Sequence, residues 1–326
     1  MSNKKIGVSF WGSPYISAQF LEKLCKDDRF EVKFVVSQED KARSRRGREV
    51  QPTPVKQVAI QNSIDVYTPK SIKKSKDSLI EQWAPYNVSF HVIFAYGKII
   101  PTELYSYPEL EAVNFHASLL PLLRGASPIE HSLIQGFTNT GWTLQRLAAS
   151  LDTGNILWQS PIPINEEDNS TTLYSHLLET LLKEGTNALR EYANQTLKDI
   201  PQDDSKATHC GKITPQMGEI HWNHSAFNIR NLFRGLQERP GVYSTWADKK
   251  VKLYLDLNKE DSPQSELQRK PGEIVEVADD CLWIACGDNE CIPINQVQLD
   301  GKKRMSAKEF INGYHAKCGS QFALKS

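Results

Sequence analysis

The residue types best suited to catalysis are the amide of Asn114 and the imidazole of His116, two positions apart. Side chains alternate along a strand, so both groups project from one face, while Val113 and Phe115 point the other way, into a sheet. A carboxylate able to orient the histidine follows at Asp152, in a Leu-Asp-Thr-Gly turn. An amide N–H and an imidazolium can stabilise the oxyanion of a tetrahedral intermediate, an effect of roughly 3 to 4 kcal/mol for each well-placed donor.

No evident serine or cysteine nucleophile accompanies these three residues in the sequence. This favours direct transfer of an acyl group to a nucleophile brought by a second substrate, with the enzyme supplying electrostatic stabilisation and no covalent intermediate. A nicotinamide oxidoreductase is disfavoured. The turn after the first strand, Phe-Trp-Gly-Ser-Pro at 10–14, is not the G-x-G-x-x-G turn that brings a pyrophosphate onto a helix end.

Alternating strands and helices must position these groups in the first half of the chain. Helices are expected to begin at Ser13-Pro14 and at Thr53-Pro54, each a capping residue followed by proline. Strands are expected at 5–10, 31–36, 64–67, 88–94 and 111–115. The pattern predicts a Rossmann-like α/β domain with a parallel sheet covered on both faces. The amide and the imidazole then lie at the carboxyl end of a strand, where such sheets bind ligands.

A polar and poorly periodic stretch divides the chain, which predicts a linker at 195–208 between a domain at 1–194 and a domain at 209–326. The elements expected before it are a helix at 127–135, a β-rich stretch at 140–164 and an amphipathic helix at 171–193. Those expected after it are a helix at 225–236 and strands at 241–246, 250–255, 272–277, 281–286 and 291–298. Five short strands at this spacing predict a small OB-like β-barrel.

The composition is that of an ordinary globular protein, with 326 residues, 39% hydrophobic and 24% charged. Because 39 Lys and Arg balance 39 Asp and Glu, a DNA-coating role is excluded, and no DNA partner is expected. The N-terminus lacks the apolar stretch of a signal peptide, and no run approaches 18 apolar residues, so we expect a cytoplasmic protein without a membrane partner. The six cysteines form no C-x-x-C pair, which predicts no metal site. A monomer is the default expectation.

Two local clusters of basic residues stand out against this neutral background. One lies within eight residues that contain no acid, and the other follows a glycine near the C-terminus. Their members are Lys41, Arg43, Arg45, Arg46 and Arg48, and Lys302, Lys303 and Arg304. Guanidinium groups pair with phosphates and stack on unpaired bases, so the clusters suit RNA. A non-catalytic RNA-binding module would explain them, but it would leave the Asn-x-His face and Asp152 without a purpose.

The sequence also resembles a known family. The run Asn-x-His-x-Ser-Leu-Leu-Pro-x-x-Arg-Gly-Ala-x-Pro-Ile from residue 114, Thr-Gly-x-Thr at 140–143 and Leu-Asp-Thr-Gly at 151–154 are similar to motifs of the folate-dependent formyltransferases. Three further segments resemble the branch that acts on initiator tRNA, and the resemblance extends over nearly the whole chain. These segments are Arg-Gly-Arg-Glu-Val-Gln-Pro-Thr-Pro-Val-Lys at 46–56, Ala-Tyr-Gly-Lys-Ile-Ile-Pro at 95–101 and Gly-Lys-Lys-Arg-Met-Ser-Ala at 301–307.

The resemblance implies that a formyl group moves from 10-formyltetrahydrofolate to the α-amino group of methionine on initiator methionyl-tRNA. It further implies that Asn114 and His116 polarise the formyl carbonyl, and that Asp152 holds His116 and assists proton movement, through water. The residues that it implies around the folate are Ser118, Leu119, Leu120 and Pro121, together with Phe94, Ala95, Tyr96 and Gly97.

For the tRNA, the resemblance implies a loop with an Arg-Gly pair that wedges into the acceptor end, and a C-terminal OB-like domain that holds the acceptor arm. Arg46 matches the pair, with Arg43, Arg45 and Arg48 as supporting contacts, and Lys302, Lys303 and Arg304 as phosphate contacts. Two alternatives share the catalytic trio. A sugar-nucleotide N-formyltransferase has less use for the two basic clusters, and a 10-formyltetrahydrofolate hydrolase would use the trio on water.

Overall fold

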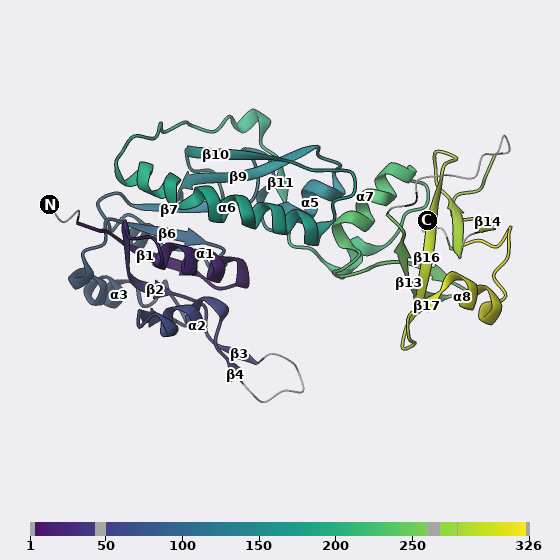
Figure 1. Cartoon of the computed structure of the whole chain (residues 1–326), viewed down its shortest axis with the longest axis horizontal. Coiled ribbons are helices and arrows are strands. Elements are labelled where there is room, and N and C mark those ends of the chain that lie inside the picture. Colours follow the sequence, from purple (N-terminus) through teal and green to yellow (C-terminus); the bar gives the residue numbers. More distant parts are fainter. Residues whose placement is uncertain (1–3, 43–49, 258, 260–267, 279, 324–326) are drawn as a thin grey trace. The chain divides into compact units, whose positions relative to one another are not determined.

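The computed structural model describes residues 4–42, 50–257, 259, 268–278 and 280–323. The chain forms two compact units (Figure 1). The N-terminal unit comprises Met1–Gly125, Gly141–Ile162 and Ser175–His209, and the C-terminal unit comprises Ala126–Thr140, Pro163–Tyr174 and Cys210–Ser326. Within the described ranges, no helix combines the length and the apolar character that crossing a membrane requires.

A seven-stranded sheet in the order β10-β9-β7-β6-β1-β2-β5 forms the centre of the N-terminal unit. Its strands are β1 (Ile6–Gly12), β2 (Phe30–Val36), β5 (Asp65–Tyr67), β6 (Phe90–Phe94), β7 (Ala112–His116), β9 (Asn139–Arg146) and β10 (Ile156–Pro163). The predicted strand positions are confirmed, and β5, β2, β1, β6 and β7 run parallel. The prediction of a wholly parallel sheet is wrong, because β9 pairs antiparallel with β7 and makes the sheet mixed.

Aromatic side chains pack helices onto both faces of this sheet. The helices are α1 (Tyr15–Cys25), α2 (Pro54–Gln61), α3 (Lys76–Trp83), η1 (Ala84–Tyr86), α4 (Thr102–Tyr105) and α6 (Ser170–Ala193). On one face, Phe20 of α1 contacts Phe115 of β7, and Gly185 of α6 lies against the Phe20 ring. On the other face, Trp83 of α3 packs against Trp11. Two short strands, β3 (Lys41–Ala42) and β4 (Val50–Gln51), pair antiparallel outside the main sheet.

The two predicted helix starts have different outcomes. Thr53 caps α2 as predicted, because its hydroxyl accepts a hydrogen bond from the backbone N–H of Lys56. At α1 the predicted cap is wrong by one residue: the N-cap is Pro14, which has no side chain that could accept a bond. The hydroxyl of Ser13 instead accepts from the N–H of Gln38, at 3.2 Å, and so ties the end of β1 to the segment after β2.

His91 on β6 is a fully buried base. The hydroxyl of Ser9 lies 2.5 Å from Nδ1 of His91 and accepts a hydrogen bond from the Trp11 indole, so we infer that this hydroxyl donates to the imidazole. The other ring nitrogen, Nε2, lies 3.1 Å from the Leu104 carbonyl oxygen. Both nitrogens of a neutral ring are therefore satisfied. Burial disfavours the charged ring and lowers the pKa of His91 from 6.5 to about 3.

This lowered pKa predicts an acid-sensitive fold. Between pH 3 and 6.5 the unfolded chain binds a proton at residue 91 that the folded chain does not bind. The free energy of unfolding should therefore fall with decreasing pH in that window, by up to about 1.4 kcal/mol per unit, and the group should have no effect above it. Urea titrations at several pH values test this, and His91→Gln should remove this part of the slope. If the free energy of unfolding depended on pH equally in the wild type and in His91→Gln, the lowered pKa of His91 would be contradicted.

The C-terminal unit is built on an antiparallel sheet in the order β12-β13-β16-β15-β14, with β17 paired to β16. Its strands are β12 (Val242–Trp246), β13 (Lys249–Leu255), β14 (Ile274–Ala278), β15 (Cys281–Ala285), β16 (Cys291–Leu299) and β17 (Met305–Ser306). The five predicted strands are confirmed. The predicted closed barrel is not confirmed, because β12 and β14 stand at opposite ends of the strand order and do not pair in the described part of the chain.

Helices complete the core of this unit. They are α5 (Pro128–Ile134), η3 (Pro215–Gly218), α7 (Ala226–Leu236) and α8 (Ala307–Tyr314), and the core gathers buried side chains such as Trp222, Phe233, Phe310 and Phe322. Helix α8 is not among the elements predicted from the sequence. Its signal is a capping box, in which the Ser306 side chain accepts from the Glu309 N–H while the Glu309 carboxylate accepts from the Ser306 N–H.

Candidate functional site

Asn114 and His116 occupy the carboxyl end of β7, which lies between β6 and β9 in the sheet. Phe115 points away from them and packs on Phe20 of α1, so the two polar groups face the side of the sheet opposite α1. The ends of the parallel strands β1, β6 and β7 share this edge of the sheet. The predicted placement at a strand's carboxyl end is therefore confirmed.

His116 and Asp152 face each other, although 36 positions in the sequence separate them. The distance from His116 Nδ1 to Asp152 Oδ2 is 3.6 Å, and the two side chains are 7% and 8% exposed. The other ring nitrogen, Nε2, lies 2.8 Å from the carbonyl oxygen of Leu123, which can only accept a hydrogen bond, so we infer that Nε2 carries a proton. A 3.6 Å separation exceeds a good hydrogen bond, so the contact of Nδ1 with Asp152 is electrostatic in this structure.

The carboxylate of Asp152 is surrounded by hydrogen-bond donors. Oδ2 accepts from the backbone N–H of Gly125 at 2.9 Å, and Oδ1 accepts from Nε2 of Gln145 at 2.8 Å. Gln145 is 1% exposed, and its register partner across the β7–β9 pair is Asn114. Gln145 could not be predicted from the sequence, because only the antiparallel register of β9 places it beside the Asn-x-His face.

The turn that carries Asp152 depends on its local backbone. Asp152 has a φ of 54°, in the left-handed region that aspartate tolerates better than most residues. Two residues on, a Cβ at Gly154 would lie 1.8 Å from the carbonyl oxygen of Arg146, so any side chain there would force the turn away from β9. These two conditions give the Leu-Asp-Thr-Gly motif a structural reason.

The residues predicted to border the folate divide into two groups. Leu120 donates its N–H to the hydroxyl of Thr143 at 3.1 Å, which fixes the segment 118–121 against β9 beside His116. Ser118 is buried and donates its hydroxyl to the Leu122 carbonyl oxygen, at 2.6 Å. Leu119 and Pro121 are partly exposed.

At the end of β6, by contrast, the predicted side chains belong to the core. Phe94 packs on Trp142, and Tyr96 packs on Trp11. Burial raises the pKa of the Tyr96 phenol well above its usual range. The residues that remain exposed there are Ala95 and Gly97, with φ values of 52° and 76°. This segment therefore offers backbone groups at the sheet edge.

Of the two basic clusters predicted to contact RNA, the structure describes the residues of only the second as a whole. Arg43, Arg45, Arg46 and Arg48 lie outside the described residues, whereas Lys302, Lys303 and Arg304 are exposed between β16 and β17. The Arg304 guanidinium carbon lies 3.5 Å from the centre of the Tyr254 ring. In the same sheet, Lys250 lies over the ring of Tyr243, with its Nζ 3.3 Å from the ring centre.

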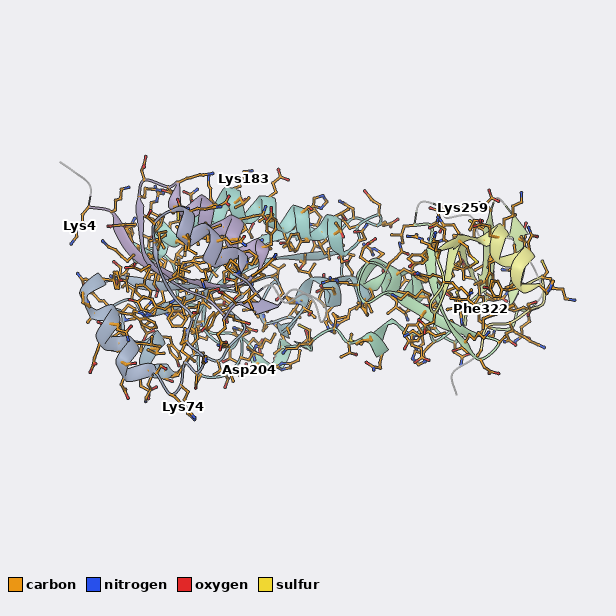
Figure 2. All side chains as sticks on the ribbon, turned by 90° about the horizontal axis from the view of Figure 1, so that it is seen from below. Lys4, Lys74, Lys183, Asp204, Lys259 and Phe322 are labelled. Atoms are coloured by element: carbon orange, nitrogen blue, oxygen red, sulfur yellow. The ribbon has the colours of Figure 1, made fainter. Side chains whose placement is uncertain are left out.

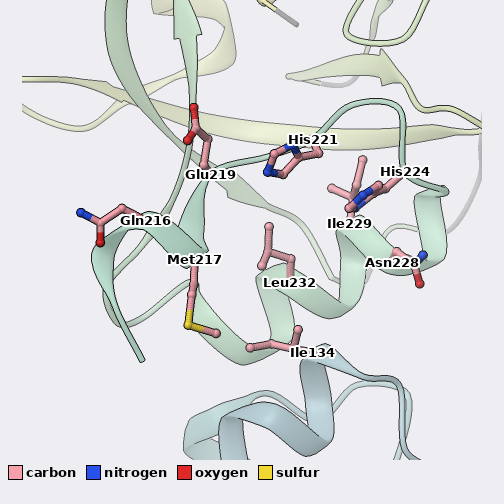
Figure 3. A pocket seen from close by; sticks show the side chains of 9 residues that line it. All are labelled: Ile134, Gln216, Met217, Glu219, His221, His224, Asn228, Ile229 and Leu232. Atoms are coloured by element: carbon pink, nitrogen blue, oxygen red, sulfur yellow. The ribbon is translucent and has the colours of Figure 1, made fainter. Parts of the chain in front are cut away.

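A pocket of about 370 Å³ opens in the C-terminal unit (Figure 3). An apolar floor formed by Ile134, Met217, Ile229 and Leu232 meets the imidazoles of His221 and His224, which stack with ring centres 5.4 Å apart. The other lining residues are Gln216, Glu219 and Asn228. None of the predicted site residues lines this pocket. Among the described residues, no group of three or more His, Cys, Asp or Glu side chains is arranged to hold a metal ion.

Comparisons with known proteins identify relatives of the whole chain. A family model described as formyl transferase matches residues 4–185, and one described as formyl transferase, C-terminal domain, matches residues 212–315. A methionyl-tRNA formyltransferase of Leptospira interrogans is 33% identical over 315 residues, which are 97% of this chain and 99% of the relative. One from Staphylococcus aureus is 35% identical over 311 residues, covering 94% of this chain and 96% of the relative.

Solved structures share the fold at lower identity. WlaRD, a sugar 3N-formyl transferase crystallised in the presence of dTDP and 5-N-formyl-THF, superposes with a TM-score of 0.63 and 20% identity, over 92% of this chain and all of that chain. HypX from Aquifex aeolicus in complex with tetrahydrofolic acid gives a TM-score of 0.59 at 15% identity, over 99% of this chain and 51% of HypX. At these identities the likeness shows a common fold.

Proposed function

This chain belongs to the formyl transferase family, and we propose that it transfers the formyl group of 10-formyltetrahydrofolate to the α-amino group of methionine on initiator methionyl-tRNA. The full-length relatives that bear the name methionyl-tRNA formyltransferase support this acceptor. The observation that carries the chemistry is the meeting of His116 with Asp152, at 3.6 Å, on the strand face that Asn114 shares. These observations support a site made of an amide, an imidazole and a carboxylate, to which we assign no protein nucleophile.

In the proposed reaction, the nitrogen of the methionine α-amino group attacks the formyl carbon. An α-amino group has a pKa near 8 or below, so an appreciable fraction is neutral and nucleophilic at pH 7. The new C–N bond leaves negative charge on the formyl oxygen. The Asn114 amide donates a hydrogen bond to this oxygen, as does Nδ1 of His116 when the ring is an imidazolium with protons on both nitrogens. The intermediate then collapses with cleavage of the bond to N10 of the folate. The proton lost by the amino nitrogen passes through the His116–Asp152 pair, by way of water, to N10.

The folate is proposed to bind at the carboxyl edge of β6 and β7. Segment 118–121 is held beside His116 by the bond between Leu120 and Thr143, and it would border the folate. Backbone groups at Ala95 and Gly97 would contact the pterin, while Phe94 and Tyr96 support them from the core. This arrangement would bring the formyl group to Asn114 and His116.

The C-terminal unit, for which the sequence predicts a domain at 209–326, is proposed to contact the tRNA as an OB-like domain. Because side chains alternate, β12 and β13 bury Val242, Val251 and Leu253 on one face and place Tyr243 and Lys250 on the other. Lys302, Lys303 and Arg304 lie in the turn after β16, with Arg304 stacked on Tyr254. Cations interleaved with aromatic rings suit phosphates and unpaired bases. The arginines 43, 45, 46 and 48 would contact the acceptor end.

Removing the three cations at 302–304 should weaken tRNA binding. In a protein with alanine at Lys302, Lys303 and Arg304, we expect KM for methionyl-tRNA to rise about tenfold, with a weaker salt dependence, because fewer counterions are released on binding. Folate binding and the turnover at saturating tRNA should change by less than about twofold. A matched control replaces three exposed lysines of the N-terminal unit, Lys70, Lys73 and Lys74. An equal rise in KM for both proteins would remove this surface from the tRNA site.

The proposed function is tested by offering three acceptors in parallel with 10-formyltetrahydrofolate. The acceptors are methionyl initiator tRNA, methionyl elongator tRNA and an amino-sugar nucleotide. We expect formylmethionine on the initiator tRNA, much less on the elongator tRNA, and no product on the sugar. Formylation of the sugar alone, or release of formate without an acceptor, would overturn the proposal and support the sugar-nucleotide enzyme or the hydrolase.

A further inference from the structure

The polar stretch after α6 belongs to the N-terminal unit and contacts the turn that carries Asp152. Ile200 exchanges two backbone hydrogen bonds with Ile156 of β10, at 2.8 and 3.0 Å. Two residues later, Nε2 of Gln202 donates to the carbonyl oxygens of Asp152 and Gly154, at 2.9 and 2.6 Å. One side-chain amide therefore holds the turn at both ends of the Asp-Thr-Gly sequence.

The orientation of the Gln202 amide is determined by its neighbours. Its oxygen accepts from Nε of Arg124 at 2.9 Å, and its nitrogen faces two carbonyl oxygens. A flipped amide would place a donor against the guanidinium and an acceptor against the carbonyls, which would lose all three bonds. Glutamine is thus matched to this position, because it alone among side chains of this length presents an acceptor and a donor.

Arg124 connects this amide to the segment around His116. Its side chain is 5% exposed, and its Nη2 donates to Asp204, at 2.7 Å. Asp204 is 84% exposed and lies at the edge of the N-terminal unit (Figure 2). The residue before Arg124 is Leu123, whose carbonyl oxygen accepts from His116, and the residue after it is Gly125, whose N–H donates to Asp152. Gln202 therefore joins the two chain segments that hold the catalytic pair.

We infer that Gln202 is a positioning residue for Asp152, and that the stretch expected to be a linker forms part of the catalytic framework. The inference rests on the proposed function. Asp152 has a left-handed backbone, with a φ of 54°, and its carbonyl oxygen is held by Gln202 while its carboxylate faces His116. Without the amide, the turn can relax and move the carboxylate away from the imidazole. Gln202 touches no reacting atom and acts through Asp152.

Two substitutions test this role. Gln202→Glu keeps an acceptor towards Arg124 but turns a carboxylate oxygen towards the two carbonyl oxygens, and Gln202→Ala removes all three bonds. We expect kcat to fall roughly 10- to 100-fold in Gln202→Glu, because small displacements of a catalytic group have effects of this size. KM for 10-formyltetrahydrofolate and for methionyl-tRNA should stay within about twofold. If Gln202→Glu does not fold, Gln202→Ala serves the same test.

Non-additivity distinguishes positioning from general stability. In a protein that already has Asp152→Ala, the further change Gln202→Glu should reduce single-turnover transfer by less than about twofold, because the group through which it acts is absent. One control applies. Gln321→Glu makes the same chemical change at an exposed glutamine whose amide also donates to a carbonyl oxygen, that of Pro271. This variant should turn over like the wild type.

The outcomes separate the two claims. If the wild type does not formylate methionyl-tRNA, the proposed function fails and the inference about Gln202 fails with it. If the wild type is active and both Gln202 variants match its kcat, the inference alone is overturned. The inference would also be overturned if adding Gln202→Glu to the Asp152→Ala protein reduced single-turnover transfer by the same factor as in the wild type.

Discussion

Replacement of His116 by alanine will lower kcat for formyl transfer about a thousandfold and leave the protein folded. The imidazole is expected to donate to the formyl oxygen in the transition state and to carry the proton with Asp152, and each of these effects contributes about 10²- to 10³-fold. The ring is held by the Leu123 carbonyl oxygen and lies 3.6 Å from the carboxylate, so its loss removes both functions at once. The fold is expected to persist, since the change leaves the packing of Phe115 on Phe20 on the opposite face of the strand intact.

Steady-state kinetics and thermal unfolding check this prediction together. KM for both substrates should change by less than about threefold, because the interaction removed is made mainly in the transition state. His131→Ala is the matched control, since a ring nitrogen of His131 also lies near a backbone carbonyl oxygen, that of Gly211 at 3.2 Å. It should turn over like the wild type. Normal turnover by His116→Ala, with the same Tm, would refute the role of His116.

Asp152→Asn will reduce kcat about a hundredfold or more, although it preserves the size of the side chain. The two carboxylate oxygens accept from Gly125 N–H and from Gln145 Nε2, and Oδ2 also faces His116. An asparagine amide must turn its NH₂ towards one of these donors, so one contact becomes a repulsion and the negative charge beside the imidazole is lost. Asp152→Ala should reduce kcat by orders of magnitude as well, which shows that the loss does not depend on a misdirected amide.

A control for Asp152 is Asp27, a carboxylate that also accepts several N–H groups. The guanidinium of Arg29 holds the pKa of Asp27 at about 2, below its usual 3.8. Asp27→Asn should lower stability by about 1 kcal/mol and leave kcat within about twofold. Rates for Asp152→Asn and Asp152→Ala equal to the rate of the control would mean that the carboxylate near His116 has no part in catalysis.

The elements around the site could be predicted where their signals are local. Runs of apolar residues predict the strands β1, β2, β6 and β7. The two-residue period of a strand places Asn114 and His116 on one face. The direction of β9 could not be predicted in the same way, because the alternation of apolar residues is identical in a parallel and an antiparallel strand. Gln145 was missed for that reason: its place beside Asn114 is a consequence of the antiparallel register.

The segment 195–208 shows a second limit. Its polar, aperiodic composition is typical of a solvated linker and predicts one. In the structure the same polarity serves hydrogen bonding, since Gln202 satisfies backbone carbonyls that a tight turn leaves without partners in the sheet. Composition does not distinguish a polar segment whose side chains are solvated by water from one whose side chains form hydrogen bonds with another turn. The capping box before α8, in contrast, is a local signal from which the start of this helix can be predicted.

A crystal structure with a non-transferable formyl-folate analogue tests the central claim most directly. The account predicts the formyl oxygen about 3 Å from the side-chain nitrogen of Asn114, with the Nδ1 side of His116 turned towards the same oxygen or bridged to it by one water. Asp152 should remain bonded to Gly125 and Gln145, as it is in the free protein. A formyl group bound beyond hydrogen-bond reach of all three side chains would contradict the account.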